Sequence, residues 1–374
     1  MKKMLFFGLA LLMLMGSVLF ADDAKVMPKM VGRFYLAPTF SFAPGAYDTD
    51  GKYQKYDNGS VKLFNLGLAL EFGITDWITG AVQWTPGWTP WSDAKAAAPS
   101  AMASQIKGDI NANGVADLFA GAKIQIVGTK APVKNDMFRF SVAPGVIIPM
   151  PGPNFQDQMD NIVAEKTATL ASNDKHVFAA GGRFYFDYII NKNFFLNLYN
   201  ETIFYPVKQD LDKDGPNLAA AKLLIPMAAG AAGPVVSADL KDATGEVSYK
   251  YKLTFELEPQ YSTPFGNGMI FSAGLPVHYV YSPAYDYSVS NVGTGLTAYG
   301  GDSEKLLLDA LQGDPQQSLS LVPNVSVMLT KTPLPLEFKL QYSVPVYGKN
   351  VMARNNITLQ VKAYFALPGA DLGK

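Results

Sequence analysis

Residues 246–261 read EVSYKYKLTFELEPQY, and apolar and polar side chains alternate through this stretch without interruption. The apolar residues from Val247 to Tyr261 fall on one parity and the polar residues from Glu246 to Gln260 on the other. A β-strand separates two such sets onto opposite faces, whereas a helix with a period of 3.6 residues mixes them. A tilted strand crosses a bilayer in about 9–11 residues. The stretch therefore predicts a strand in the wall of a membrane β-barrel, with lipid on one face and water on the other.

The first residues predict export from the cytoplasm. Lys2 and Lys3 precede an apolar stretch over 4–20, and Ala21 stands before two aspartates. A positive start, an apolar run and a small residue at its end are typical of a secretory signal peptide. We predict a signal peptide over 1–21 and a single outer-membrane β-barrel domain over 22–374. The chain contains no cysteine, which excludes a lipid-anchored cysteine and disulfides.

The composition excludes several other classes. Charged residues make up 17% of the chain and the net charge is −1, so we expect no nucleic-acid partner. After residue 21 no uninterrupted apolar run reaches the roughly 18 residues that a helical span requires. Apolar residues spread at alternate positions produce this balance in a membrane barrel.

Eleven further stretches have strand-like composition, and several alternate as clearly as 246–261. The twelve predicted strands are 33–42, 60–72, 77–87, 115–127, 137–149, 177–190, 194–206, 246–261, 268–281, 318–330, 335–346 and 356–366.

The connections between these strands predict their topology. The first ten alternate between long, 17 to 39 residues, and short, 3 to 9 residues, when counted between the ranges above. An antiparallel up-and-down barrel with short periplasmic turns and long extracellular loops shows this order. We therefore predict an all-β, 12-stranded transmembrane barrel in the outer membrane of a diderm bacterium, surrounded by outer-membrane lipid. The apolar loop over 218–238 and a helix over 303–311 are expected to form a lid over the barrel mouth.

Prolines interrupt the pattern. Pro38, Pro144, Pro276 and Pro323 fall in the middle of predicted strands, and a closed barrel has no free edge for a residue without an N–H, so we expect bulges or kinks there. Counting inward from the 150–176 loop places Pro144 and Gly145 opposite Gly181 and Gly182. Two interpretations remain open: a lateral opening through which an apolar solute leaves, or a bulge that curves the wall.

Three short segments carry a family resemblance. Residues 114–123 read GVADLFAGAK, residues 148–152 read IPMPG, and residues 72–76 read FGITD. Together they resemble the outer-membrane barrels of the meta-pathway phenol-degradation family, over roughly residues 60–155. The chain is more weakly similar to the fatty-acid and toluene channels, whose N-terminal hatch residues 22–32 are too short to supply. The resemblance implies passage of small, often aromatic or hydrophobic compounds.

Inward parity predicts a largely charged lumen. The lumen-lining candidates are Asp117, Lys123, Arg139, Arg183, Asp187, Tyr199, Glu201, Lys250, Lys252, Glu256, Glu258, Glu337, Lys339 and Lys362. Aromatic and aliphatic residues on the same parity of 194–206 and 268–281 make another part of the wall apolar. Such a lumen fits a narrow amphipathic conduit, or a filled barrel whose ion pairs hold it shut.

Two loops have the spacing of weak calcium sites. Asp210, Asp212 and Asp214 precede a glycine, and so do Asp109, Asn111 and Asn113. Alternating oxygen ligands before a glycine match the first half of an EF-hand loop. The twelfth position is alanine in both, Ala221 and Ala120, so we expect at most weak Ca²⁺ binding in extracellular loops and no other cofactor.

The sequence does not favour an enzyme. It contains two histidines, and neither belongs to a pattern with metal-ligand or nucleophile spacing. Our main prediction is an outer-membrane channel that passes small, hydrophobic or aromatic solutes. The alternative is a non-conducting surface barrel that acts as an adhesin or a structural protein. Inward aromatics along a continuous path favour the channel, and a lumen closed by ion pairs favours the surface role.

Overall fold

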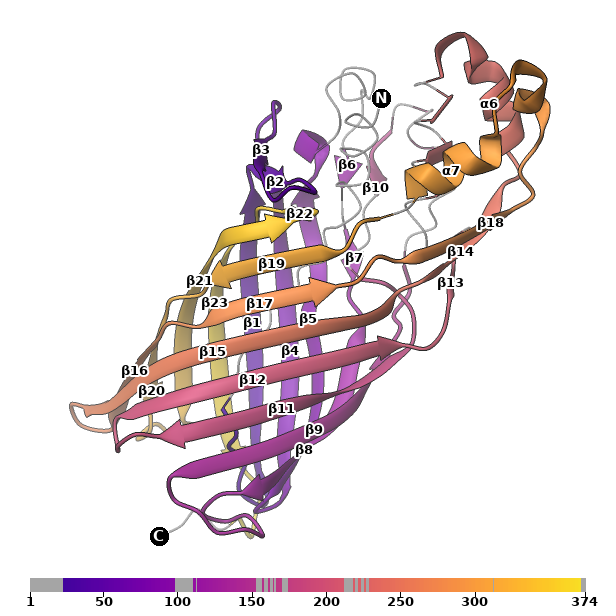
Figure 1. Cartoon of the computed structure of the whole chain (residues 1–374). Helices are drawn as coiled ribbons and strands as arrows, with labels where there is room; N and C mark the ends of the chain where they lie inside the picture. Colours follow the sequence, from indigo (N-terminus) through magenta and orange to yellow (C-terminus); the bar gives the residue numbers. More distant parts are fainter. Residues whose placement is uncertain are drawn as a thin grey trace.

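The computed structural model is a closed antiparallel β-barrel of twelve strands (Figure 1). It describes residues 23–97, 110–111, 113–152, 157, 161, 164, 166–169, 174–211, 218, 221–222, 225–226, 229–311 and 313–370. The predicted signal peptide lies outside the described residues. Within the described residues no helix has the length and apolarity to span a membrane.

Each predicted strand corresponds to one wall strand, so the predicted fold class is confirmed. In wall order they are β1 (Val31–Ala43), β4 (Val61–Thr75), β5 (Ile78–Asp93), β8 (Leu118–Val127), β9 (Phe138–Ile148), β11 (Ala179–Ile189), β12 (Phe194–Tyr205), β15 (Lys250–Phe265), β16 with β17 (Met269–Gly274, Val277–Ser282), β20 with β19 (Asn324–Leu329, Gln316–Leu321), β21 (Leu336–Lys349) and β23 (Asn355–Ala366). Pairing of β1 with β23 closes the barrel.

The long connections gather at one end of the barrel, which we call the loop end, and the short turns lie at the other, the turn end (Figure 1). In outer-membrane barrels these are the extracellular and periplasmic ends. The last wall strand, β23, ends at the turn end, where Leu367 N–H donates to Met30 O at 2.9 Å.

Alternation along each strand separates the two faces as predicted. On β15, Phe255 and Leu257 point outward and are 48% and 42% exposed, whereas Glu256 and Glu258 point inward and are buried. Outward apolar side chains in water would be costly, but in a bilayer they contact lipid. The barrel is therefore apolar outside and polar inside.

Residues 246–261 do not form one strand, which corrects the prediction. The chain turns at Lys250, whose φ is 61°, and the residues before it form β14 (Thr244–Ser248) in a separate sheet. Val247 and Tyr249 are therefore buried in a loop-end core instead of facing lipid. A left-handed residue moves the chain out of the ladder while leaving the alternation intact, so the pattern could not reveal it.

Every mid-strand proline coincides with a break in pairing. Pro276 separates β16 from β17, and Pro323 separates β19 from β20. The β1–β23 ladder skips Pro38, and the β8–β9 ladder skips two residue pairs at Pro144. A residue without an N–H cannot complete the ladder, so each break is local and the register resumes beyond it.

A small apolar domain rises from one side of the loop end (Figure 1). We call it the cap; it comprises β13 (Gln209–Asp210), β14, β18 (Asp286–Ser290), η2 (Gly230–Ala232), α6 (Gly233–Leu240), η3 (Gly295–Tyr299) and α7 (Ser303–Leu311). Val236, Leu240 and Leu307 are fully buried in it and share one core with Ile203 of the barrel wall. The helix predicted over 303–311 is confirmed as α7.

The remaining short elements decorate the loop end. They are β2 (Gly45–Tyr47), β3 (Tyr53–Lys55), β22 (Val351–Met352), η1 (Lys95–Ala97), β6 (Ile110–Asn111), β7 (Gly114–Val115) and β10 (Ala168–Thr169). The first three form one sheet, which continues the wall beside β1 and β21.

Candidate functional site: a loop-end cavity above a closed lumen

The predicted lumen residues face inward, with one exception. Buried or half-buried inside the barrel are Asp117, Lys123, Arg139, Arg183, Asp187, Tyr199, Glu201, Lys252, Glu256, Glu258, Glu337, Lys339 and Lys362. Most are paired, for example Arg139 with Asp187 at 3.4 Å and Lys362 with Glu337 at 3.1 Å. Lys250 is the exception: its ammonium pairs at 2.9 Å with the exposed Asp286 of β18, outside the lumen.

A hydrogen-bonded network lies inside the lumen in front of the wall strands from β5 to β12. Arg183 of β11 donates to Gln83 Oε1 of β5 at 2.5 Å and to Glu201 Oε2 of β12 at 2.6 Å. Strands β8 and β9 lie between β5 and β11 in the wall, so the first bond passes in front of both. The guanidinium also lies over the Phe119 ring, 3.7 Å from its centroid. We call Arg183, Gln83, Glu201 and Phe119 the septum.

The septum continues as a chain of bonds along the wall. Gln83 Nε2 donates to Tyr35 Oη at 3.3 Å and to Glu71 Oε1 at 3.2 Å. Glu71 also accepts from Tyr35 and from Arg33, the latter at 2.5 Å. Charge-assisted bonds of this kind are stronger than neutral ones, so the septum holds its shape at rest.

Below the septum, the chain's own N-terminal segment lies inside the barrel. The amide of Ala24 donates to Asp187 Oδ1 at 2.9 Å, and its carbonyl accepts from Gln125 Nε2 at 2.9 Å and from Ser141 Oγ at 2.5 Å. Lys123 donates to Asp23 O at 2.9 Å. Ala24 is fully buried, so this segment lies inside the lumen against β8, β9 and β11.

The same segment explains one glycine of the FGITD motif. Residues 27–28 run against Gly73, and a Cβ there would overlap the Pro28 carbonyl oxygen. Met30 N–H donates to Gly73 O at 2.9 Å. The prediction that 22–32 is too short for a hatch stands, but sequence reasoning missed that the described residues 23–30 lie in the lumen.

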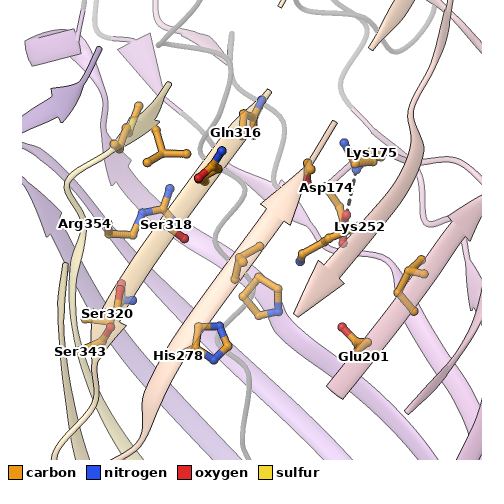
Figure 2. Close-up of a pocket in the computed structure, with 18 of the residues that line it drawn as sticks. Asp174, Lys175, Glu201, Lys252, His278, Gln316, Ser318, Ser320, Ser343 and Arg354 are labelled. Carbon is orange, nitrogen blue, oxygen red and sulfur yellow. Dashed lines mark hydrogen bonds between the residues drawn. The ribbon is translucent and has the colours of Figure 1, made fainter. Parts of the chain in front are cut away.

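Above the septum lies a cavity of about 220 Å³ (Figure 2). One side is polar and the other mixes aromatic, aliphatic and charged groups. Its lining includes Ser318, Ser320, Ser343, Gln316, Asn356 and Arg354, and, on other strands and loops, Phe119, Ile147, Ile203, Val280, Tyr205, Tyr285, Lys175 and Lys252. A second cavity of about 20 Å³ lies between the septum and Lys25. Phe119 and Arg183 line both cavities, so they separate them.

Lys175 stands where the cavity meets the cap. Its ammonium donates to Tyr285 Oη at 2.7 Å and lies 3.9 Å, 4.1 Å and 5.3 Å from the ring centroids of Tyr249, Tyr285 and Tyr205. Three rings and a hydroxyl stabilise the charge. Burial nevertheless lowers the pKa of Lys175 to about 7, and burial raises the pKa of Tyr285 to about 12. No pattern in the sequence predicts this arrangement, because the four residues come from four separate segments.

Asp117 ties two loops together at the cavity edge. Its carboxylate accepts from the amides of Met150 at 2.9 Å and His176 at 3.0 Å, and lies 3.3 Å from His176 Nδ1. Burial raises the pKa of Asp117. Burial disfavours the charged imidazole, yet the Asp117 hydrogen bond and charge raise the pKa of His176. The carboxylate therefore positions loops, which is a structural role beside its place in the lining.

The register places the lateral-opening residues as counted. Gly145 pairs with Gly181 and Pro144 with Gly182 in an unbroken β9–β11 ladder. The two missing pairs lie on the other side of β9, toward Ala122 and Lys123 of β8. The lateral opening stays a prediction. The missing pairs favour the seam between β8 and β9 over the seam between β9 and β11 as its position.

The calcium candidates stay predictions. Asp109, Asp212 and Asp214 lie outside the described residues, whereas Asp210, Asn111 and Asn113 lie within them. Asn113 Oδ1 is close to the Ser92 hydroxyl, at 3.2 Å. The described part of the chain contains no group of three or more acidic or histidine side chains placed to hold a metal ion.

Comparison with known proteins gives structural relatives alone. No family model matches the chain, and no curated protein does. The COG4313 outer membrane channel from Pseudomonas putida F1 is similar over 93% of this chain and 100% of its own, with 12% identity and a TM-score of 0.54. The NanC porin covers 89% of this chain and 100% of its own, at 6% identity and a TM-score of 0.37. The Pseudomonas putida toluene transporter TodX covers 90% of both chains, at 9% identity and a TM-score of 0.34.

At 12% identity, the similarity to the COG4313 channel establishes the fold of the chain but does not identify its solute. Nearly the whole of both chains takes part, so the shared fold includes the wall and its closure. The chain has the fold of a 12-stranded outer-membrane channel.

Proposed function

We propose that this protein is an outer-membrane channel that passes small hydrophobic or aromatic solutes. The observation that carries the proposal is the 220 Å³ cavity at the loop end, lined in part by Phe119, Ile203 and Tyr205 inside an otherwise charged barrel. A barrel whose interior served stability alone would have no reason to keep apolar side chains around a cavity. The fold shared with the COG4313 channel supports the same function.

The proposed route of the solute has two steps. A solute enters the cavity from the loop end and meets the septum, where Arg183 and Phe119 close the way to the small cavity below. The second step is exit, either past Ala24 toward the turn end or sideways at the β8–β9 seam beside Pro144. Passage therefore needs movement of the septum, and the channel is closed until this occurs.

One observation favours the alternative function. Ion pairs such as Arg183–Glu201 join neighbouring wall strands and hold the barrel together, and the packed cap gives the loop end a stable outer surface. A closed barrel with an ordered surface domain would suit a non-conducting adhesin or structural protein. The difference between the two functions is whether the septum opens.

The decisive experiment uses the full chain in liposomes and planar bilayers. Uptake of toluene and of phenol into protein-containing liposomes, above the rate in protein-free ones, is expected for the channel. Single-channel recording is expected to show brief openings from a closed baseline. If the protein gives neither solute uptake nor channel openings over a range of voltages, the channel function is wrong and the surface role remains.

We further propose that the protein is not an enzyme. The pair closest to a hydrolase dyad is His278, whose Nδ1 lies 3.0 Å from Glu256 Oε2, with Ser320 opposite it in the β17–β19 ladder. Within the described residues the Ser320 hydroxyl has no hydrogen bond to that ring. A nucleophile needs such a bond for activation. Hydrolysis of short p-nitrophenyl esters by wild type, lost in His278→Ala, would contradict this.

A further inference from the structure

The cavity contains a guanidinium without an acidic partner. Arg354 lies between β22 and β23, and it has the inward parity of Asn356 and Thr358. Figure 2 shows it on the polar side of the cavity, beside Ser318, with Ser320 and Ser343 below it. These hydroxyls come from β21, which pairs with β23 in the wall, and from β19, which pairs with the other side of β21. A cation and several small donors therefore converge on one side of the cavity.

No carboxylate among the described residues neutralises Arg354. The other arginines described in the lumen each have an acidic partner: Arg33 and Arg183 a glutamate at 2.5–2.6 Å, and Arg139 an aspartate at 3.4 Å. Arg354 has no ion pair in the described part of the chain, and burial lowers its pKa to about 10. Arg354 is half-buried, and a ligand that supplies the missing negative charge would stabilise it.

Two more polar groups beside it lack partners. The Tyr56 hydroxyl, which lies near enough to influence the charge of Arg354, is buried with no hydrogen bond in the described residues. Asn356 Oδ1, on the same strand and inside the cavity lining, is also buried and unsatisfied. Buried polar atoms are rarely left in this state. The Tyr56 hydroxyl is a donor without an acceptor, whereas the Asn356 oxygen is an acceptor and needs a donor such as a hydroxyl in the cavity.

The opposite side of the cavity adds positive charge. Lys175 and Lys252 both line it. Of the three acidic residues in the lining, Glu201 is held by Arg183 at 2.6 Å and Asp117 lies against His176. The third, Asp174, accepts from the backbone amides of Asp117 at 3.1 Å and Lys175 at 2.9 Å. The local field in the cavity therefore favours an anion.

The cavity also has room for an apolar body beside the anion. Ile147, Ile203, Val280 and Tyr205 line it, and its volume of about 220 Å³ far exceeds the roughly 10–15 Å³ that one water needs. An inorganic anion would leave these side chains without contact. An aromatic ring that carries a carboxylate would cover them and reach the guanidinium.

We propose that the loop-end cavity is a binding site for small aromatic monocarboxylates, with the carboxylate on Arg354 and the ring against the apolar side. The guanidinium makes two parallel N–H···O bonds, and the serine hydroxyls that line the cavity provide further donors. This inference rests on the proposed function and names the solute class of the same cavity. The channel then selects an ionised head together with an aromatic body.

Calorimetry on the full chain in detergent tests the site with benzoate, its neutral analogue benzamide, and acetate. Wild type is expected to bind benzoate at least 10-fold more tightly than either of the others. Arg354→Gln is expected to weaken benzoate binding roughly 10- to 100-fold, the effect of losing one charge-assisted pair, and to leave benzamide unchanged. Arg354→Lys keeps the positive charge but cannot make two parallel N–H···O bonds, so its affinity for benzoate is expected to lie between those of wild type and Arg354→Gln.

The matched control is Lys52→Gln, which removes one positive charge from an exposed loop at the same end of the barrel. Equal weakening in this variant would show a general surface effect and overturn the proposal. So would unchanged benzoate binding in Arg354→Gln, or acetate that binds as tightly as benzoate. Toluene uptake by liposomes distinguishes failure of this proposal from failure of the proposed function. If one of these contrary results is found but wild type still takes up toluene, the aromatic-carboxylate site is wrong and the channel function remains. If wild type passes neither toluene nor benzoate, the proposed function fails.

Discussion

The hydrogen bond between Gln83 and Arg183 is the part of the septum that can be removed with least damage. Gln83→Ala deletes the acceptor on β5, whereas Arg183 keeps Glu201 at 2.6 Å and its place over Phe119. Glu71 keeps Arg33 and Tyr35. No buried charge loses its counter-charge, so the barrel is expected to fold as wild type.

The size of the effect follows from the bond that is lost. A hydrogen bond to a charged group contributes about 1.5–3 kcal/mol. If the closed septum alone makes this bond, its loss raises the open fraction roughly 10- to 100-fold, since about 1.4 kcal/mol is a factor of ten. Single-channel recording in planar bilayers measures the open probability directly, and toluene uptake by liposomes should rise with it.

The control is Gln341→Ala, which removes an inward, buried glutamine from β21, away from the septum. Its open probability should equal that of wild type. The reasoning is refuted if Gln83→Ala leaves the open probability unchanged, or if Gln341→Ala raises it as much.

Three further predictions concern other parts of the molecule. Asp239 accepts from the amides of Gly295 and Leu296 and from the Ser303 hydroxyl, so Asp239→Ala should destabilise the cap by about 1–3 kcal/mol, seen as faster proteolysis of the loop end with the barrel intact. Because the pKa of Lys175 falls from 10.5 to about 7 on folding, the unfolded chain binds more protons between these values, and stability should rise with pH there; urea unfolding of Lys175→Met should lose this slope. Pro144→Val should restore pairing at the β8–β9 seam and slow uptake of an apolar tracer into liposomes; unchanged uptake would remove the lateral opening.

The wall could be predicted from the sequence because its signal is local. The alternation of apolar and polar residues indicates which face of a strand contacts lipid, and about ten residues of one strand are enough to show it. The order of long and short connections then fixed the topology. Proline breaks followed from the missing N–H alone, as at Pro276 and Pro323. For the same reason most inward charges, such as Glu256 and Lys339, were assigned to the correct face.

The closure of the lumen could not be predicted, because its contacts are far apart in sequence. Gln83 and Arg183 are 100 residues apart, and Ala24 reaches Ser141 over 117. The periodicity of a strand predicts which of its side chains point inward, but it does not predict which side chains of other strands they contact. Lys250 shows the limit at short range, since its left-handed backbone keeps the alternation but changes the sheet that the chain joins.

The two exits below the septum differ in how many interactions each must break. Toward the turn end, three hydrogen bonds hold Ala24, to Asp187, Gln125 and Ser141, and at about 0.5–1.5 kcal/mol each they oppose displacement by roughly 1.5–4.5 kcal/mol. At the β8–β9 seam, beside Pro144, two residue pairs of the ladder are already absent, and the small cavity reaches Ala122 and Ala143 there. The bilayer outside the seam also accepts an apolar solute that the water beyond the turn end would oppose. For a neutral apolar solute both terms favour the sideways exit, whereas an anion that has left Arg354 is opposed by the bilayer and must displace Ala24.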